Sequence, residues 1–359
     1  MLRSYVRMYQ QKRTNPRPNI KIVKESPSIV TLDGDKGLGV HTAPKAMKLA
    51  VDKAKKNGAE VVVLLSHNGF DVDQKLASML DNVDVILTGH THDAIPRAIK
   101  IKNTLLLSSG SHGKYLGRID LKVDNGKVVD FSSNLIPIFS DVIQPDPEMT
   151  RLIDKIREPY EEECNRVVGE AETLLYRRGN FGGPWDSVIC DAIIQERDTE
   201  ISLSPGFRWG TTLLPGQKIT IDDIYSQTSM NYPEVYRTEM NGETIKNLLE
   251  DVCDNIFNPD PFFQQGGDMV RVGGMTYTCQ PKNSMGNRIS DLKLSNGEKI
   301  ESQKKYTVGG WGSINPEVEG PPIYKLLEDY ISGEKIIKPK HNNPVTVSYT
   351  HLTLPTSDL

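Results

Sequence analysis

Three of the seven histidines in this 359-residue chain lie in two short segments, "LLSHNG" and "GHTHD". They are His67, His90 and His92, and each follows the end of an apolar run typical of a buried strand. Imidazole is a ligand that suits Mn, Zn and Fe rather than Mg or Ca. In open α/β sheets, ligands bind beyond the carboxyl ends of the strands. The spacing therefore predicts a metal centre at one sheet edge, and it leaves open whether one ion or two are bound.

An alternative is that one histidine caps a strand end and the other two face the solvent. For a single histidine we would prefer this alternative, but three histidines at two neighbouring strand ends favour metal binding. Asp71, Asp73 and Asp93 lie nearby in the sequence and are candidates for hydrogen bonds that orient the metal ligands.

The elements that must position these histidines form a crossover unit. Residues 59–66 and 83–89 are short apolar runs, typical of strands buried on both faces. The intervening residues 73–82 have helical periodicity. A strand, a helix and a second strand in this order predict parallel neighbours whose carboxyl ends lie side by side. We expect an amphipathic helix over residues 43–57, ended by Gly58, and then a three-stranded meander over residues 103–136, with a turn at 124–126.

The pattern predicts an α/β first part and an α+β second part, joined by a charged helix. We expect a metal-binding domain over residues 1–145 and a linker helix over residues 146–164. A substrate-binding domain would follow over residues 165–346, and residues 347–359 would be a non-native tail.

The overall composition excludes several classes of protein. The formal net charge is −4, without a basic cluster, which argues against a nucleic-acid partner. No apolar run approaches the length that crosses a bilayer, so we expect no membrane segment. The four cysteines are widely spaced, which argues against a zinc knuckle and favours buried thiols, with one disulfide as the alternative.

The two histidine motifs resemble the late motifs of calcineurin-like metallophosphoesterases, in the branch shared with 5′-nucleotidases. The resemblance implies a partial αββα sandwich followed by a 5′-nucleotidase-type C-terminal domain. It implies that His67 and His90 bind one metal ion and His92 binds its neighbour. The family's early motifs, which include the bridging aspartate and the catalytic histidine, are not recognisable. We therefore assign no catalytic residue, and we expect an N-terminally truncated enzyme.

The second domain carries segments that resemble the family's substrate-binding motifs, "SLSPGFRWG" and "FFQQGGDMVRVGG". Arg208 suits a bidentate contact with an anion, and a surface ion pair is the alternative. Gly266 and Gly267 would let the backbone approach a ligand, and Asp268 would orient that ligand or cap a turn. Tyr232 is retained at one of the two positions where nucleotidases stack the base.

The other stacking position is occupied by Met269 and Val270, which argues against a nucleotide substrate. In these variants the chain resembles the thiosulfohydrolases of the SoxB type. That resemblance implies a periplasmic dimanganese enzyme, with Zn or Fe as alternative metals. The enzyme would release sulfate from a cysteine S-thiosulfonate on the arm of the Sox sulfur-carrier protein. Trp209 would line the channel for this arm or lie in the core. A 5′-nucleotidase-like phosphoesterase and a non-catalytic fragment are the other hypotheses.

Overall fold

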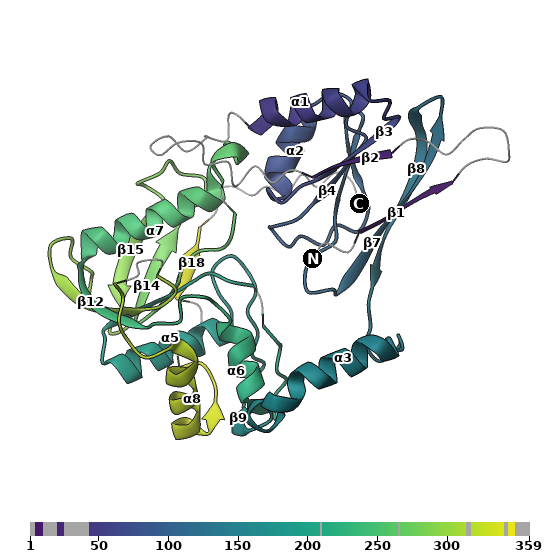
Figure 1. The fold of residues 1–359 in the computed structure, drawn as a ribbon. Coiled ribbons are helices and arrows are strands. Elements are labelled where there is room, and N and C mark those ends of the chain that lie inside the picture. The colour runs from purple at the N-terminus through teal and green to yellow at the C-terminus, as the bar shows by residue number, and fades with distance from the viewer. Residues whose placement is uncertain are drawn as a thin grey trace, which may run out of the picture. The chain divides into compact units, whose positions relative to one another are not determined.

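The computed structural model describes residues 4–9, 20–24, 43–208, 210–264, 266–313, 317–340 and 344–348. The chain divides into two compact units (Figure 1). The first unit comprises Met1–Asp146 together with Asn258–Gly266, and the second comprises Pro147–Phe257 together with Gly267–Leu359. The segment Asn258–Gly266, predicted as part of the substrate-binding domain, thus belongs to the first unit.

The main sheet of the first unit confirms the predicted crossover. Strand β3 (Val61–Leu65) pairs in parallel with β4 (Val85–Thr88), and helix α2 (Phe70–Met79) connects them. Strand β2 (Ile20–Lys24) extends the sheet in parallel on the far side of β3. Because β3 and β4 are buried on both faces, they need the continuous apolar sequence that predicted them.

The predicted meander is wrong in its first strand. Strand β6 (Thr104–Ser108) pairs in parallel with β4, and the short strand β5 (Ile99–Ile101) closes the edge as its antiparallel partner. All residues of β6 are buried, as in a central parallel strand. The hairpin of β7 (Tyr115–Asp124) and β8 (Lys127–Pro137) is as predicted.

The turn of this hairpin and its neighbouring strand follow from local chemistry. Asn125 and Gly126 both have positive φ, as a two-residue hairpin turn requires. Strand β1 (Ser4–Tyr9) pairs in parallel with β7, which gives a second, three-stranded sheet in this unit.

Alternating side chains of the main sheet are buried in two different cores. Val62, Leu64 and Ile86 face a core with helices α1 (Ala43–Lys56) and α2. Val61 and Val63 face Ile119 and Leu121 of β7 on the other side. This alternation is the two-residue period of a strand buried on both faces. The described part of the unit thus shows three layers, a helix layer and two sheets, of the expected αββα sandwich.

The second unit begins with the predicted linker and continues as an α+β fold. The linker comprises α3 (Pro147–Arg157), η2 (Glu158–Tyr160) and α4 (Glu161–Cys164), none of which contains a buried residue. Three small sheets follow, in the orders β11-β9-β17, β12-β16-β10-β13 and β15-β14-β18. Their strands are β9 (Val167–Ala171), β10 (Ile201–Ser204), β11 (Lys218–Thr220), β12 (Tyr236–Asn241), β13 (Arg271–Gly273), β14 (Met275–Cys279), β15 (Ile289–Leu294), β16 (Lys305–Gly310), β17 (Ile336–Ile337) and β18 (Val345–Val347).

The helices of the second unit pack between and over these sheets. They are α5 (Pro184–Arg197), α6 (Ile221–Thr228), α7 (Gly242–Phe257) and α8 (Ile323–Glu334). The short turn η3 (Pro261–Phe263) lies in the segment Asn258–Gly266, which belongs to the first unit. Helix α5 is central: Trp185, Ile189 and Ile193 are fully buried and pack in a core shared with α8. The first turn of α5 therefore lies in the interior, where its polar side chains need partners.

Candidate metal centre and anion-binding site

Four histidines follow the carboxyl ends of three adjacent parallel strands in the first unit. His67 follows β3, and His90 and His92 follow β4, as predicted. His112 follows β6, which is the next strand in the sheet, and the sequence analysis did not single it out. The apolar run of residues 104–108 that precedes it is the signal in the sequence that could have pointed to it.

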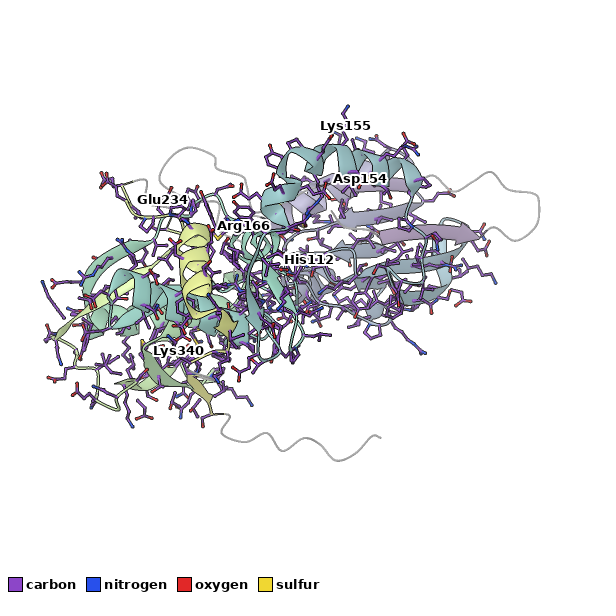
Figure 2. All side chains as sticks on the ribbon, turned by 90° about the horizontal axis from the view of Figure 1, so that it is seen from below. His112, Asp154, Lys155, Arg166, Glu234 and Lys340 are labelled. Carbon is purple, nitrogen blue, oxygen red and sulfur yellow. The ribbon has the colours of Figure 1, made fainter. Side chains whose placement is uncertain are left out.

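The imidazoles lie in two contacting pairs. The ring centroids of His67 and His90 are 5.1 Å apart with an edge-on geometry, and those of His92 and His112 are 5.8 Å apart. His112, labelled in Figure 2, is exposed. Its Nδ1 lies 2.8 Å from the Ser111 hydroxyl. The structure thus brings His67 and His90 together, and it places His92 against His112.

The backbone at this sheet edge is unusual. His90, His92 and His112 all have positive φ, of 80°, 59° and 59°. This left-handed region is uncommon for residues other than glycine, although histidine tolerates it better than bulky side chains do. Such conformations concentrate at functional sites, where the surrounding structure maintains them.

Asp73 holds the loop that carries His67. It is fully buried on α2, and its Oδ1 accepts hydrogen bonds from the Ser66 hydroxyl at 2.8 Å and the Asn68 amide at 3.2 Å. These two residues flank His67 in the sequence. Burial raises the pKa of Asp73, partly opposed by hydrogen bonds from Thr88, Ser66 and Asn68.

The other two predicted aspartates lie in the same region. Asp93 accepts a hydrogen bond from the Thr91 hydroxyl between His90 and His92. Burial, and then the nearby charge of Asp93, raise the pKa of Asp71. Burial and the proximity of His90 lower the pKa of His67, which favours the neutral imidazole that binds metals.

These donors fit the chemistry of a divalent transition metal, but they make only part of a ligand set. Imidazole pairs in contact, with carboxylates nearby, suit Mn, Zn or Fe. Within the part of the chain that the structure describes, no three His, Cys, Asp or Glu side chains are arranged to hold an ion together. The His67–His90 pair is the best candidate for two of the ligands.

In the second unit, the predicted anion-binding arginine is bound to an acidic side chain. Arg208 Nε donates to Asp268 Oδ1 at 2.6 Å, and Arg208 Nη2 donates to Asn180 Oδ1 at 2.7 Å. Asp268 Oδ2 accepts from Arg271 Nη2 at 2.9 Å. Asp268 therefore orients two guanidinium groups. The Arg208 side chain remains 25% exposed, so one part of it is open to the surface.

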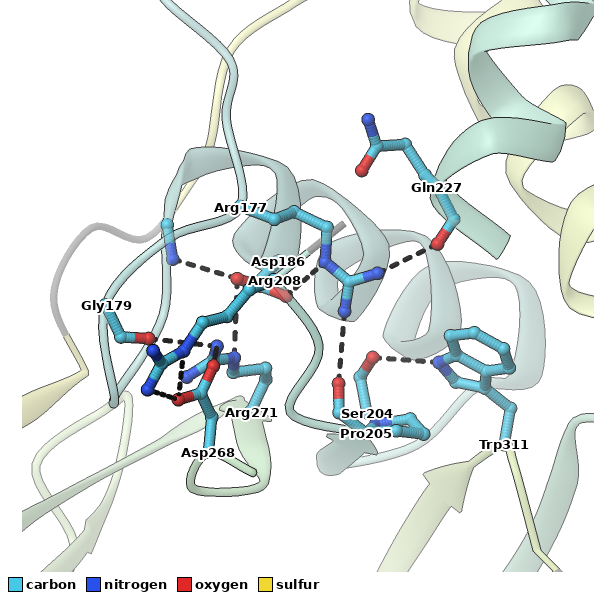
Figure 3. A network of polar contacts seen from close by, with 11 residues as sticks. Arg177, Gly179, Asp186, Ser204, Pro205, Arg208, Gln227, Asp268, Arg271 and Trp311 are labelled. Atoms are coloured by element: carbon cyan, nitrogen blue, oxygen red, sulfur yellow. Dashed lines mark hydrogen bonds and ion pairs between the residues drawn. The ribbon is translucent and has the colours of Figure 1, made fainter. Parts of the chain in front are cut away.

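A larger buried network continues from this point (Figure 3). Asp186 Oδ1 accepts from Arg177 Nε at 2.7 Å, and its Oδ2 lies 3.4 Å from Arg271 Nε. Arg177 also donates to the backbone oxygens of Gln227 and Pro205. With Arg208 and Asp268, the network contains three guanidinium groups and two carboxylates. A single anionic ligand would balance this charge.

Sequence reasoning missed Arg177 and Asp186. Asp186 is the third residue of α5, and its carboxylate accepts from the backbone nitrogen of Gly183 at 2.9 Å, as in a capping box. A capping acidic residue before an apolar helix is a recognisable signal. The partners of Arg177 are distant in the sequence and could not be found from spacing.

The remaining predicted residues lie in different environments. Tyr232 is 44% exposed, whereas Met269 is fully buried in the core of the second unit. Gly266 and Gly267 both have positive φ, of 76° and 88°. Trp209 lies outside the described residues.

Comparison with known proteins identifies relatives of this chain. Residues 167–314 match the family model of the 5′-nucleotidase C-terminal domain. The structure of sulfate thiohydrolase SoxB from Thermus thermophilus is 33% identical in sequence, with a TM-score of 0.81 over 85% of this chain and 57% of that chain. The chain is thus similar to 5′-nucleotidases in its second unit and to sulfate thiohydrolase SoxB in its fold. The predicted fold class is therefore confirmed.

A second relative has a lower sequence identity to this chain. The trifunctional nucleotide phosphoesterase YfkN of Bacillus subtilis is 26% identical over 274 residues, which are 72% of this chain and 18% of that protein. The chain spans 18% of the YfkN sequence and 57% of the SoxB chain. The metallophosphoesterase YunD of Bacillus subtilis is 37% identical over 70 residues, which are 20% of this chain and 15% of that protein, and such a relative implies dependence on a divalent metal.

The amino-terminal part also matches a different family. Residues 1–94 match the family model of malate/L-lactate dehydrogenases. The L-sulfolactate dehydrogenase of Methanocaldococcus jannaschii is 28% identical over 261 residues, which are 69% of this chain and 68% of that protein. This match is consistent with the lack of recognisable early metallophosphoesterase motifs in these residues. The likeness to SoxB covers 85% of this chain, against 69% for the dehydrogenase, and has the higher sequence identity, 33% against 28%.

Proposed function

We propose that this chain carries part of a dimetal thiosulfohydrolase, which releases sulfate from a cysteine S-thiosulfonate on a sulfur-carrier protein. The observation that carries the proposal is the burial of Met269, directly after Asp268. A side chain with no exposed surface cannot stack on a nucleotide base. The 33% identity to sulfate thiohydrolase SoxB supports the same substrate class.

The reaction is a hydrolysis with a simple balance. Water attacks the sulfonate sulfur, the bond between this sulfur and the sulfane sulfur breaks, and the products are sulfate, one proton and a cysteine persulfide. Two manganese ions, with zinc or iron as alternatives, would activate the water and neutralise charge on the sulfonate. His67 and His90 would hold one ion and His92 the other.

The protein's own groups supply binding and orientation. Arg208, held by Asp268 and Asn180, would bind an anionic group of the substrate through its guanidinium. The surplus positive charge of the buried network favours an anionic substrate over a neutral one. Asp73 holds the loop of His67 in place through Ser66 and Asn68.

The proposal extends to the partner and the compartment. We propose a carrier protein with a flexible thiosulfonate-bearing arm as the partner and the periplasm as the location. In the described residues, no helix is both long and apolar enough to cross a membrane. Neither a membrane nor a nucleic acid is part of the proposal.

The test measures two products from the same protein preparation. The chain, loaded with Mn²⁺, is incubated with thiosulfonate-bearing carrier protein and, separately, with nucleoside monophosphates. We expect sulfate release and no phosphate release. Rapid phosphate release would support the alternative nucleotide phosphoesterase, which the match to YfkN and the exposed Tyr232 favour. Two bound metal ions with neither product would show that this chain is not catalytic.

A further inference from the structure

The segment Asn258–Gly266, here called the clip, is held to helix α2 by one lysine. Lys75 Nζ donates to Asp260 Oδ1 at 2.5 Å and lies 4.3 Å from the centre of the Phe262 ring. Phe262 is only 5% exposed. The same ammonium therefore makes an ion pair and a cation–π contact with residues two positions apart.

The clip also has internal bonds that fix its shape. Asp260 Oδ1 accepts from the backbone nitrogen of Phe262 at 2.9 Å, which caps the turn η3. The Gln264 amide donates to the backbone oxygen of Asn258 at 2.7 Å, which closes the two ends of the segment. These bonds hold residues 258–264 together as one turn, which Lys75 binds to α2.

The far end of the clip lies against a predicted metal ligand. A Cβ atom built on Gly266 would lie 2.6 Å from Nε2 and 2.7 Å from Cδ2 of His90. Both distances are far below a van der Waals contact, so an alanine at this position would displace the His90 ring. The backbone of Gly266 therefore covers the Nε2 edge of the imidazole.

We propose that the clip is a positioning device for His90. It places Gly266 on the Nε2 edge of the ring, fixes the ring orientation and thereby selects Nδ1 as the metal-binding nitrogen. Groups around a ligating histidine set its orientation and its metal affinity. This inference rests on the proposed metal centre, and it assigns to Gly266 a role other than contact with substrate.

The chain offers a matched pair of variants for the test. Gly266→Ala and Gly267→Ala both place alanine at positive φ, of 76° and 88°, so both variants carry similar backbone strain. A Cβ on Gly267 meets no described atom within 4 Å, whereas a Cβ on Gly266 meets His90. We expect Gly266→Ala to weaken Mn²⁺ binding by about tenfold or more, measured by titration calorimetry, and Gly267→Ala to retain the wild-type affinity. Equal losses in the two variants would overturn the proposal.

A second measurement uses the metal-free protein. Histidine ring signals in ¹⁵N–¹H spectra report the environment of His90 without any ion. We expect Gly266→Ala and Lys75→Met to shift these signals, and Lys305→Met, which removes an exposed ion pair with Glu239, to leave them unchanged. Unchanged signals in both first variants would overturn the role of the clip. If the wild-type protein binds no Mn²⁺, the proposed metal centre fails, and the metal-free spectra still decide whether the clip positions the ring.

Discussion

The two units hold their functional side chains in opposite ways. In the first unit, the imidazoles lie on loops beyond strand ends, and positive φ values at His90 and His92 aim them. In the second unit, Arg177, Asp186 and Arg271 are buried and are held by one another. In a loop site, the local backbone geometry determines where the side chains point. In a buried ionic network, the side chains stay paired because an unpaired charge away from water has a high free-energy cost.

Because of this difference, substitutions in the first unit should mainly change metal binding, and substitutions in the buried network should mainly change folding stability. A histidine on a loop can be removed with little loss of packing, so its removal should change metal binding more than folding. A buried carboxylate between two guanidinium groups cannot be removed without leaving charges unpaired in the interior. The variants below test this comparison.

The largest effect on stability is expected from Asp186→Ala. The substitution removes the partner of Arg177 and Arg271 and the cap on the backbone of Gly183. Breaking a buried ion pair by removing one partner costs about 3–5 kcal/mol. Chemical denaturation followed by circular dichroism measures the change. Asp222→Ala, which breaks the exposed pair with Arg157, is the control and should leave the midpoint unchanged.

His90→Ala is expected to weaken metal binding and to leave folding stability unchanged. It removes one imidazole of the His67–His90 pair, and Mn²⁺ affinity should fall by at least about tenfold while the melting temperature of the metal-free protein stays the same. Calorimetry and a thermal melt give the two numbers. His112→Ala sharpens the result, because we expect a smaller loss there. A larger loss for His112→Ala would move the metal centre to the His92–His112 pair.

The sequence predicted those features that depend on short-range patterns. The continuous apolar runs of β3 and β4 identified the crossover and placed three histidines at one sheet edge. The turn at Asn125 and Gly126 identified the hairpin. Each of these follows from the period of burial or from local backbone chemistry.

The features that were missed depend on contacts between distant segments. Arg177 donates to Gln227, fifty residues away, and the clip meets α2 from almost two hundred residues further along the chain. Strand β6 was misassigned because a buried apolar run does not reveal which strand it pairs with. Tertiary pairing, rather than propensity, decided each of these cases.

A pH-dependent effect is expected from Asp73→Asn in the first unit. Burial raises the pKa of Asp73 above its ordinary value of 3.8, so the folded state retains a proton that the unfolded state releases. The wild-type protein therefore loses stability as the pH rises above about 4 and through the raised pKa. Asparagine keeps the acceptor for Ser66 and Asn68 without this loss.

The measurement is the free energy of unfolding from pH 4 to pH 8 for both proteins. We expect Asp73→Asn to be the more stable protein at pH 7 and the difference to shrink towards pH 4. Asp81→Asn, at an exposed position, serves as the control. A variant less stable than the wild-type protein at pH 7 would show that the charged carboxylate is needed to hold the loop of His67.

The smallest effect is expected from a neutral hydrogen bond in the same interior as the ionic network. Trp311 Nε1 donates to the Ser204 hydroxyl at 2.8 Å, and both residues are buried. Trp311→Phe leaves this hydroxyl without its donor and should cost about 1 kcal/mol. The double variant with Ser204→Ala should recover part of this loss, since both polar partners are then removed. Trp311→Phe could instead lower the free energy of unfolding as much as Asp186→Ala does. In that case burial, rather than charge, would make the second unit sensitive to substitution, and the contrast between the two units would not hold.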